Sequence, residues 1–171
     1  MTSQGSPSGS PYTPEPVFQT SGGLDQLPGH AIRRLHQISV GIFHQELQEY
    51  NLTPVQYGAL RTLLDQPGID QRTLARLIAL DTSTTAGVVD RLEARGLLQR
   101  NLSPEDKRVR LLSLTEEGRA LCALAQPKVL RAQELTLGPL SPDQRQTFMQ
   151  LLNQLVTENN EFSRAPSETG R

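Results

Sequence analysis

The stretch LARLIALDTSTTAGVVDRLEARGLLQR, residues 74–100, decides the fold. It contains the end of one short apolar helix, a break at LDTS, and a second amphipathic helix that should stop at Gly96, because glycine favours the conformation that follows a helix end. Asp70, just upstream, can cap the first of the two helices. Two short helices joined by a tight turn are typical of a helix-turn-helix, which places its second helix in the major groove of DNA.

A basic hairpin should follow the second helix. The segments LLQRN and RVRLLSL, residues 97–101 and 108–114, are rich in β-forming residues, and the turn-forming SPED separates them. Residues 95–110 hold five Lys and Arg against two acidic residues, a local charge of +3 on a chain whose net charge is −1. Such a charge run is often only a solvated face. Beside a helix-turn-helix, however, a basic ribbon predicts the winged form of that motif.

Capped helices flank this unit on both sides. Upstream, apolar residues recur at helical spacing over residues 28–50, and TPVQ at residues 53–56 forms a capping box for a helix that reaches about Leu64. Downstream, Thr115 should open one helix, and SPDQ at residues 141–144 another with a single apolar stripe of Phe148, Leu151, Leu152, Leu155 and Val156. The expected order is α-α-α-α-β-β-α-α. This is a mainly α fold with a small β-hairpin, a winged helix-turn-helix with flanking dimerisation helices.

Length and composition limit the class of protein. A chain of 171 residues has room for about one domain with tails, and with no Trp and 4% aromatic residues its core must be mostly aliphatic. No apolar run is long enough to span a membrane and no N-terminal secretion signal is recognisable, so we expect a cytoplasmic protein. The sequence also lacks a nucleophile elbow, a phosphate loop and a metal-ligand cluster. It therefore predicts neither an enzyme, nor a metal site, nor a cofactor.

The single cysteine, Cys122, lies in the apolar run LCALA without a flanking cation. We expect a structural thiol, because a peroxide-sensing cysteine needs a lowered pKa. A thiol-based redox regulator acting through Cys122 is the alternative.

Side chains on the second helix of the motif and on the wing are predicted to contact DNA. They are Ser83, Thr84, Gly87, Arg91, Arg95, Asp106, Lys107 and Arg108. Hydroxyl groups can bond base edges or phosphates, arginine can neutralise phosphates, and a glycine permits close approach. On the wing, Arg108 can enter the narrow minor groove and Asp106 can orient it. The alternatives are that Ser83 and Thr84 only cap their helix and that the turn is an ordinary solvated one.

Polar groups within the apolar faces of two helices suggest a ligand site. His36 and Ser39 fall inside the apolar arc of the first long helix, with Arg33 at its edge, and Tyr57 lies on the apolar face of the next helix. Arg33 could pair with the carboxylate of a small aromatic acid, while His36 or Tyr57 bonds a ring substituent. The alternative is that these groups satisfy one another or a dimer partner.

The runs LTPVQYGALRTL, LARLIALDTSTTAGVVDRLEARGLLQR and SPEDKRVRLLSLTEEGRAL together resemble the multiple antibiotic resistance regulator (MarR) family over about residues 52–121. Asp106 and Arg108 match the Asp-x-Arg wing motif of that family, and LTEEG matches the opening of its fifth helix. The resemblance implies an obligate homodimer, built from the first and the last two helices, that binds a pseudo-palindromic operator in double-stranded DNA. Gly87 departs from the family pattern, in which a long polar or basic side chain is frequent, so base reading should depend more on Ser83, Thr84 and the wing.

The segment PGHAIRRLHQI, followed by PVQYGALRTL, is similar to a sub-group of the family that governs aromatic-acid breakdown, including nicotinate degradation. This similarity implies a small aromatic acid as effector. Two function classes are open. The first is a repressor that a small molecule releases from its operator, and the second is a ligand-blind DNA-binding or architectural protein.

The expected organisation has five parts. A disordered tail covers residues 1–24, a first dimerisation helix 25–51, the DNA-binding lobe 52–114, the C-terminal dimerisation helices 115–164, and a second tail 165–171.

Overall fold

The computed structural model describes residues 23–163 and residue 165. The chain divides into one part that ends at Gln37 and another that begins at Ile38, and each is described within itself. Most of the two expected tails lies outside the described residues. Leu24, the last residue of the expected N-terminal tail, already belongs to a 3-10 turn, η1 (Leu24–Gln26).

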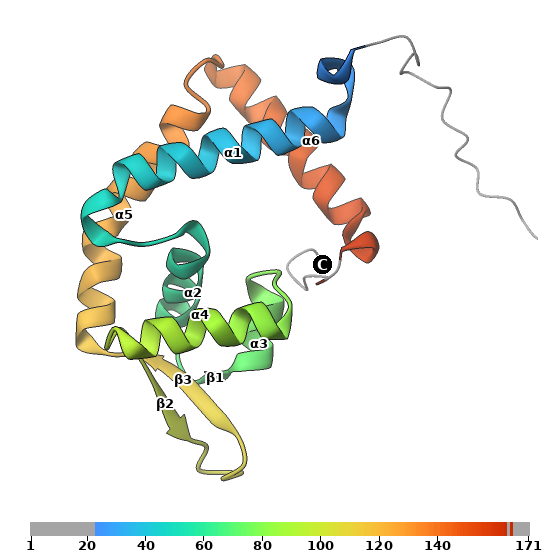
Figure 1. Ribbon diagram of the computed structural model, residues 1–171. Coiled ribbons are helices and arrows are strands. Elements are labelled where there is room, and N and C mark those ends of the chain that lie inside the picture. Colours follow the sequence, from blue (N-terminus) through green and yellow to red (C-terminus); the bar gives the residue numbers. More distant parts are fainter. Residues whose placement is uncertain (1–22, 164, 166–171) are drawn as a thin grey trace, which may run out of the picture. The chain divides into compact units, whose positions relative to one another are not determined.

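Helices dominate the structure, in the expected order (Figure 1). They are α1 (Pro28–Glu46), α2 (Pro54–Asp65), α3 (Gln71–Leu77), α4 (Thr82–Ala94), α5 (Glu116–Thr136) and α6 (Pro142–Glu158), with short 3-10 turns η2 (Gln48–Tyr50) and η3 (Asn160–Phe162). The predicted mainly α fold with a small β-hairpin is confirmed.

The predicted capping residues start the helices. Thr53 and Ser141 each accept a hydrogen bond from the backbone three residues on, within complete capping boxes. Three further N-caps are Asp70, Asp81 and Thr115. At the end of α4, Gly96 has a φ of +69°, and its N–H donates to the carbonyl of Glu93 at 2.8 Å. The local sequence therefore sets where these helices begin and where α4 ends.

The first long helix is shorter than its periodicity predicts. It ends at Glu46, and η2 carries the chain to Asn51, which has a left-handed φ of 48°. Leu47 is 1% exposed, so the chain turns around a core residue and the apolar pattern continues past the helix end. Asparagine tolerates the left-handed region better than most residues, which suits position 51 to this turn.

A small antiparallel sheet has the order β1-β3-β2. The predicted hairpin consists of β2 (Leu98–Leu102) and β3 (Arg110–Leu114), with Leu98 opposite Leu114. Strand β1 (Ile69–Asp70) pairs Ile69 with Leu112, and the predicted element order omitted it. Two residues are too few to produce a periodic pattern, and their pairing depends on a strand about 40 residues away in the chain.

The core of the second part of the chain is built around α2. Leu60 and Leu63 of this helix are 0% exposed, and α2 packs against α3, α4, α5 and β3. The other large aliphatic side chains that are almost completely buried are Leu47, Leu74, Val89, Leu92, Leu98, Leu112 and Leu114. Burial of each leucine contributes about 1.5–3 kcal/mol, so this aliphatic cluster holds α4 and the hairpin in a fixed arrangement.

The N-cap of α5 is hydrogen-bonded to the segment that joins α4 to the hairpin. The hydroxyl of Thr115 donates to the carbonyl of Gly96 at 2.6 Å, and its backbone N–H donates to the carbonyl of Leu97 at 3.3 Å. A Cβ atom on Gly118 would lie 2.0 Å from the Leu97 carbonyl oxygen. The glycine of the LTEEG motif thus allows α5 to approach the backbone that joins α4 to β2.

Candidate nucleic-acid interface

Helix α4 presents one buried and one exposed face. Its buried side chains are Thr85, Val88, Val89 and Leu92. Ser83, Thr84 and Arg91 are exposed and Gly87 is half-buried, as a face for DNA requires. Thr85, a polar residue with 0% exposure, donates its hydroxyl to the carbonyl of Asp81 at 2.8 Å and so needs no other partner.

The first turn of α4 is organised by Asp81. One carboxylate oxygen of Asp81 accepts the hydroxyl of Ser83 at 2.6 Å and the backbone N–H of Thr84 at 2.8 Å. The other carboxylate oxygen accepts the hydroxyl of Thr84 at 2.6 Å. The hydrogen bonds from the Ser83 and Thr84 side chains hold the pKa of Asp81 far below its ordinary value. Ser83 and Thr84 therefore help to order the helix start and remain exposed beside it.

Gly87 and Arg91 lie one helical turn apart on the exposed face. The guanidinium of Arg91 folds back over Gly87, where a Cβ atom would lie 3.4 Å from its nearest nitrogen. That distance is an ordinary van der Waals contact. Two of the residues predicted to contact DNA are thus neighbours, and the absence of a side chain at Gly87 leaves room for the Arg91 guanidinium against the helix.

Arg95, at the C-cap of α4, has a structural role that its sequence position did not predict. Its guanidinium donates to the backbone carbonyls of Asn51 at 2.7 Å and Tyr50 at 3.0 Å. These bonds join the end of α4 to the connector between α1 and α2. Contact between Arg95 and DNA stays a prediction.

The side chain of Arg100 likewise binds other residues of this chain. From β2 it forms ion pairs with Asp90 and Glu93 of α4. Partial burial alone would lower the pKa of Arg100, but the hydrogen bond to Asp90 and the charge of Glu93 raise it. Arg95, which is exposed but bonded to two backbone carbonyls, and Arg100 therefore contribute less to a basic patch than the local charge suggests. The other three cations of the segment, Lys107, Arg108 and Arg110, are exposed on the hairpin.

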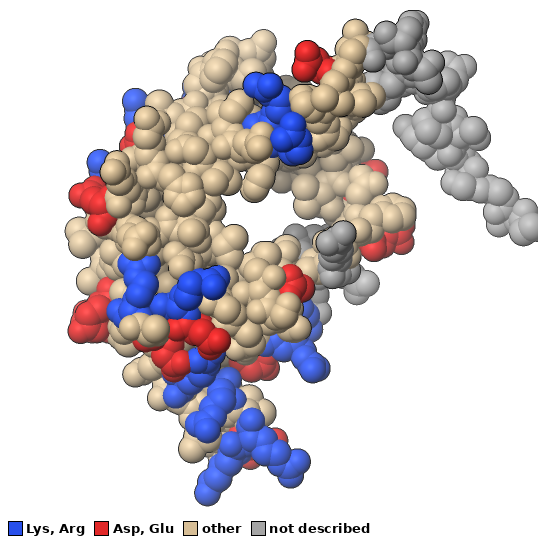
Figure 2. Space-filling model, viewed as in Figure 1, with Lys and Arg blue, Asp and Glu red and all other residues tan. Residues whose placement is uncertain are grey.

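The hairpin projects beyond the helices, and its Lys and Arg side chains gather at the far end (Figures 1 and 2). Asp106 accepts the backbone N–H of Arg108 at 2.9 Å, which fixes the turn. The Arg108 side chain is 95% exposed, and its Nε lies 4.0 Å from the Asp106 carboxylate. Asp106 thus orders the backbone of the wing tip and leaves the guanidinium of Arg108 open to an outside partner.

The predicted ligand residues fall in both parts of the chain. In the first, Arg33 is exposed and donates to the Gln37 side chain at 3.0 Å, and His36 is exposed. In the second, Ser39 is half-buried, and Tyr57 packs on the core with its ring 6.4 Å from that of Phe43. Burial raises the pKa of the Tyr57 phenol, which therefore stays protonated at neutral pH. That the four side chains share one pocket stays a prediction.

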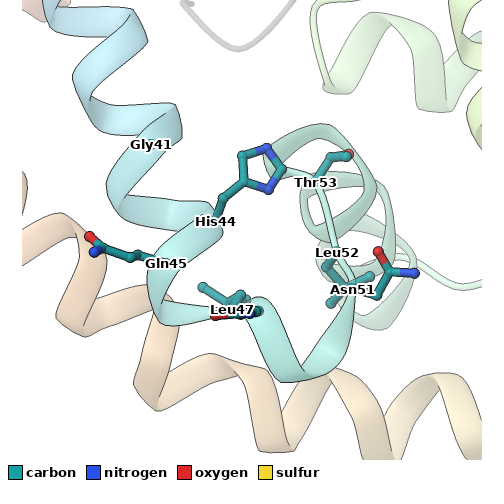
Figure 3. A pocket seen from close by; sticks show the side chains of 8 residues that line it. Gly41, His44, Gln45, Leu47, Asn51, Leu52 and Thr53 are labelled. Atoms are coloured by element: carbon teal, nitrogen blue, oxygen red, sulfur yellow. The ribbon is translucent and has the colours of Figure 1, made fainter.

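A cavity of about 450 Å³ lies where α1 leads into α2, with His44 and Thr53 extending from the two sides (Figure 3). It is lined by Gly41, His44, Gln45, Leu47, Gln48, Asn51, Leu52 and Thr53. These described lining residues include none of the predicted ligand residues and no Lys, Arg, Asp or Glu. The cavity offers neutral hydrogen-bonding groups and an imidazole, so the carboxylate of an acid would find no permanent cation on its wall.

Cys122 and the possible metal ligands are the other groups for which the sequence made a prediction. Cys122 is 1% exposed, and burial raises the pKa of its thiol, which disfavours the reactive thiolate. Among residues 23–163 and 165, no cluster of three His, Cys, Asp or Glu side chains could hold a metal ion. None of the helices described here is long and apolar enough to cross a membrane.

An outward-facing helix, seated on two others and flanked by a basic two-stranded ribbon, defines a winged helix-turn-helix protein. The model of the MarR family matches residues 52–109. The HTH-type transcriptional repressor NicR of Pseudomonas putida is 32% identical over 141 residues, which are 82% of this chain and 89% of NicR. The chain belongs to the MarR family of transcription regulators.

Solved structures of two regulators share this fold. BpsR of Bordetella bronchiseptica, whose DNA binding is regulated by 6-hydroxynicotinic acid, is 34% identical, with a TM-score of 0.75 over 78% of this chain and 96% of BpsR. The transcriptional repressor CouR, solved bound to a 23-mer DNA duplex, is 30% identical, with a TM-score of 0.74 over 81% of this chain and 99% of CouR.

Proposed function

We propose that this regulator is a homodimeric repressor, and not an enzyme, that binds a pseudo-palindromic operator and is released from it by a small aromatic carboxylic acid. The structure of the wing is the observation that best supports DNA binding. Arg108 stands 95% exposed at the tip of a ribbon whose turn is fixed by Asp106 and whose strand is tied to α4 by Arg100. A cation exposed at the tip of a ribbon beside an exposed helix can bind the DNA backbone or enter a narrow minor groove.

The apolar surface that the described chain leaves uncovered supports a dimer. Helix α6 has no buried residue, and Leu151, Leu155 and Val156 are 56%, 55% and 63% exposed. These side chains belong to the stripe predicted for dimerisation. Contiguous apolar surface of this kind marks an interaction site, and a second copy of the chain would cover both stripes at once.

The relatives support the existence of a small-molecule effector. BpsR responds to 6-hydroxynicotinic acid, and NicR is a repressor of similar sequence. We infer an effector of the same chemical kind here, a ring that carries a carboxylate. Arg33, an exposed cation on the first helix, is the proposed partner of that carboxylate, with His36, Ser39 and Tyr57 as proposed neighbours.

Arg108→Ala should weaken operator binding about tenfold or more and leave the fold intact, because the side chain is solvent-exposed and has no core contact. Lys107→Ala should mainly reduce the salt dependence of binding, by about one phosphate contact. Fluorescence anisotropy with a labelled operator over a series of salt concentrations measures both effects. Unchanged affinity of the Arg108 variant at moderate salt would mean that the hairpin tip is an ordinary solvated turn.

Arg33→Ala should leave operator affinity nearly unchanged but raise the concentration of 6-hydroxynicotinic acid needed for release by about tenfold, because the lost guanidinium pairs with the acid and not with phosphate. His36→Ala should act in the same direction. Arg34→Ala, which removes the adjacent exposed arginine, is the matched control. If Arg34→Ala alone lowers the response, or if Arg33→Ala abolishes DNA binding without ligand, the assignment of the pocket is wrong.

The ligand-blind alternative predicts a different result in a thermal-shift screen of aromatic acids. A ligand that binds the native state raises the melting temperature, whereas a ligand-blind protein shows no shift with any acid. The redox alternative is disfavoured by the burial of Cys122.

A further inference from the structure

The C-terminal end of α4 is joined to two other segments of the chain within three consecutive residues. Arg95 binds the connector that follows α1, through the carbonyls of Asn51 at 2.7 Å and Tyr50 at 3.0 Å. The carbonyls of residues 96 and 97 accept hydrogen bonds from Thr115, the N-cap of α5. In Figure 1 the end of α4 lies beside the start of α5. Because α1 and α5 are both helices proposed for dimerisation, this end of α4 connects the DNA-binding helix to the segments that lead to them.

The bond pattern of Arg95 fixes a direction as well as a distance. Tyr50 is the last residue of η2 and Asn51 is its C-cap, and carbonyl groups at a helix end lack partners within the helix. The planar guanidinium presents its N–H groups as a rigid fork, so it can bond two neighbouring oxygens at once. Hydrogen bonds from a charged donor are roughly twice as strong as neutral ones. Arg95 thus holds the end of α4 against the connector through two strong, directed bonds.

A fixed direction of α4 matters most when two lobes bind one duplex. In a dimer, both copies of α4 must enter major grooves on the same side of the DNA, so their separation must match that of the half-sites. One added base pair moves a half-site along the axis and rotates it about the axis by roughly 35°. The dimer reaches the moved half-site only if the DNA twists or α4 turns relative to the dimerisation helices. Bonds that resist such a turn make the dimer selective for spacing.

We propose that Arg95 is a positioning residue: by holding the end of α4 to the connector between α1 and α2, it determines which spacing of operator half-sites the dimer accepts. The inference rests on the proposed function, in which a homodimer binds two half-sites. It gives Arg95 a role different from the DNA contact predicted from its position in the chain.

The test compares the affinities of the full-length protein for three duplexes. The first is an operator selected from random DNA, the second has one base pair inserted between its half-sites, and the third keeps only one half-site. Fluorescence anisotropy measures each affinity. The unchanged protein should bind the second duplex about 30-fold more weakly than the first, because either DNA or protein must deform to reach the rotated half-site.

Arg95→Lys is the informative variant. Lysine keeps the positive charge and would still neutralise a phosphate, but it has no planar fork to bond two carbonyls in parallel. The preference for the first duplex over the second should fall to about fivefold or less, as the loss of two charged hydrogen bonds requires. Affinity for the single half-site should change by less than about twofold. Because the readout is a ratio of affinities, a smaller folded fraction does not alter it.

Arg95→Ala separates positioning from contact with DNA. This variant should lose the spacing preference as Arg95→Lys does, and its affinity should keep the salt dependence of the unchanged protein, because no phosphate contact is removed. Weaker binding to the single half-site, together with a salt dependence reduced by about one phosphate contact, would instead assign Arg95 to the DNA backbone and overturn the inference.

Lys128→Ala is the matched control. Lys128 of α5 pairs with Glu49 of η2 at 3.9 Å, so this substitution removes a cation bound to the same connector from a helix other than α4. It should keep the full spacing preference. Equal preference in the Arg95 variants and the unchanged protein would overturn the inference and leave a dimeric regulator in place. An unchanged protein that binds all three duplexes equally would overturn the proposed recognition of two half-sites as well.

Discussion

Gly118→Ala should lower the free energy of unfolding by at least about 2 kcal/mol, with a fall in Tm of about 5–10 °C. The added methyl group would lie 2.0 Å from the Leu97 carbonyl oxygen. The contact is with backbone, which no side-chain rotation can relieve, so α5 must move away from the hairpin root. That movement would also strain the Thr115 bonds to Gly96 and Leu97.

Gly58→Ala is the matched control for this experiment. Gly58 lies within α2, and a Cβ atom there would have no neighbour within 4 Å. Alanine is a better helix former than glycine, so this variant should be more stable by about 0.5–1 kcal/mol. Thermal unfolding should be compared at equal protein concentration, because the melting temperature of a dimer depends on it. Equal stability of the two variants would contradict the close approach of α5.

Leu155→Glu should convert the protein to a monomer and reduce operator affinity by roughly 100-fold or more. The side chain is 55% exposed on the apolar stripe of α6, so the described chain alone would tolerate the charge. In the proposed dimer, the same position would bury an unpaired carboxylate against its copy. Loss of the second DNA-binding lobe then removes the gain in affinity from bivalent binding, typically 10²–10⁴-fold.

Gln150→Glu places the same charge on the opposite, exposed side of α6 and should leave both assembly and DNA binding nearly unchanged. Sedimentation velocity at micromolar concentration measures the oligomeric state, and anisotropy measures operator affinity. A Leu155→Glu variant that remains dimeric would show that α6 does not form the interface. Stable monomers of the unchanged protein would contradict the dimer itself.

Local sequence was sufficient to predict most of the fold. Each N-cap acts within three residues, so Thr53, Asp70 and Ser141 could be recognised without knowledge of the tertiary structure. Gly96 ended α4 for an equally local reason, its positive φ. Strand β1 and the end of α1 were missed because both depend on packing with residues distant in sequence.

The candidate site was predicted less completely, because charge and exposure do not follow from position in the chain. Arg95 and Arg100 belong to a basic run, yet the first bonds to carbonyls 44 and 45 residues away and the second to two carboxylates of α4. The sequence places Asp81 in the break before the second helix of the motif. That its carboxylate accepts hydrogen bonds from two hydroxyl groups follows only from the side-chain geometry. No sequence pattern predicted the cavity beside His44 and Asn51, because the residues that line it belong to the end of one helix and to the connector that follows.

Footprinting on the protein's own promoter, with and without 6-hydroxynicotinic acid, tests the central claim most directly. We predict two protected half-sites related by twofold symmetry, with centres one helical turn or a multiple of it apart, and loss of both protections together when the acid is added. Protection without symmetry, or symmetric protection that no aromatic acid removes, would contradict an effector-released dimeric repressor.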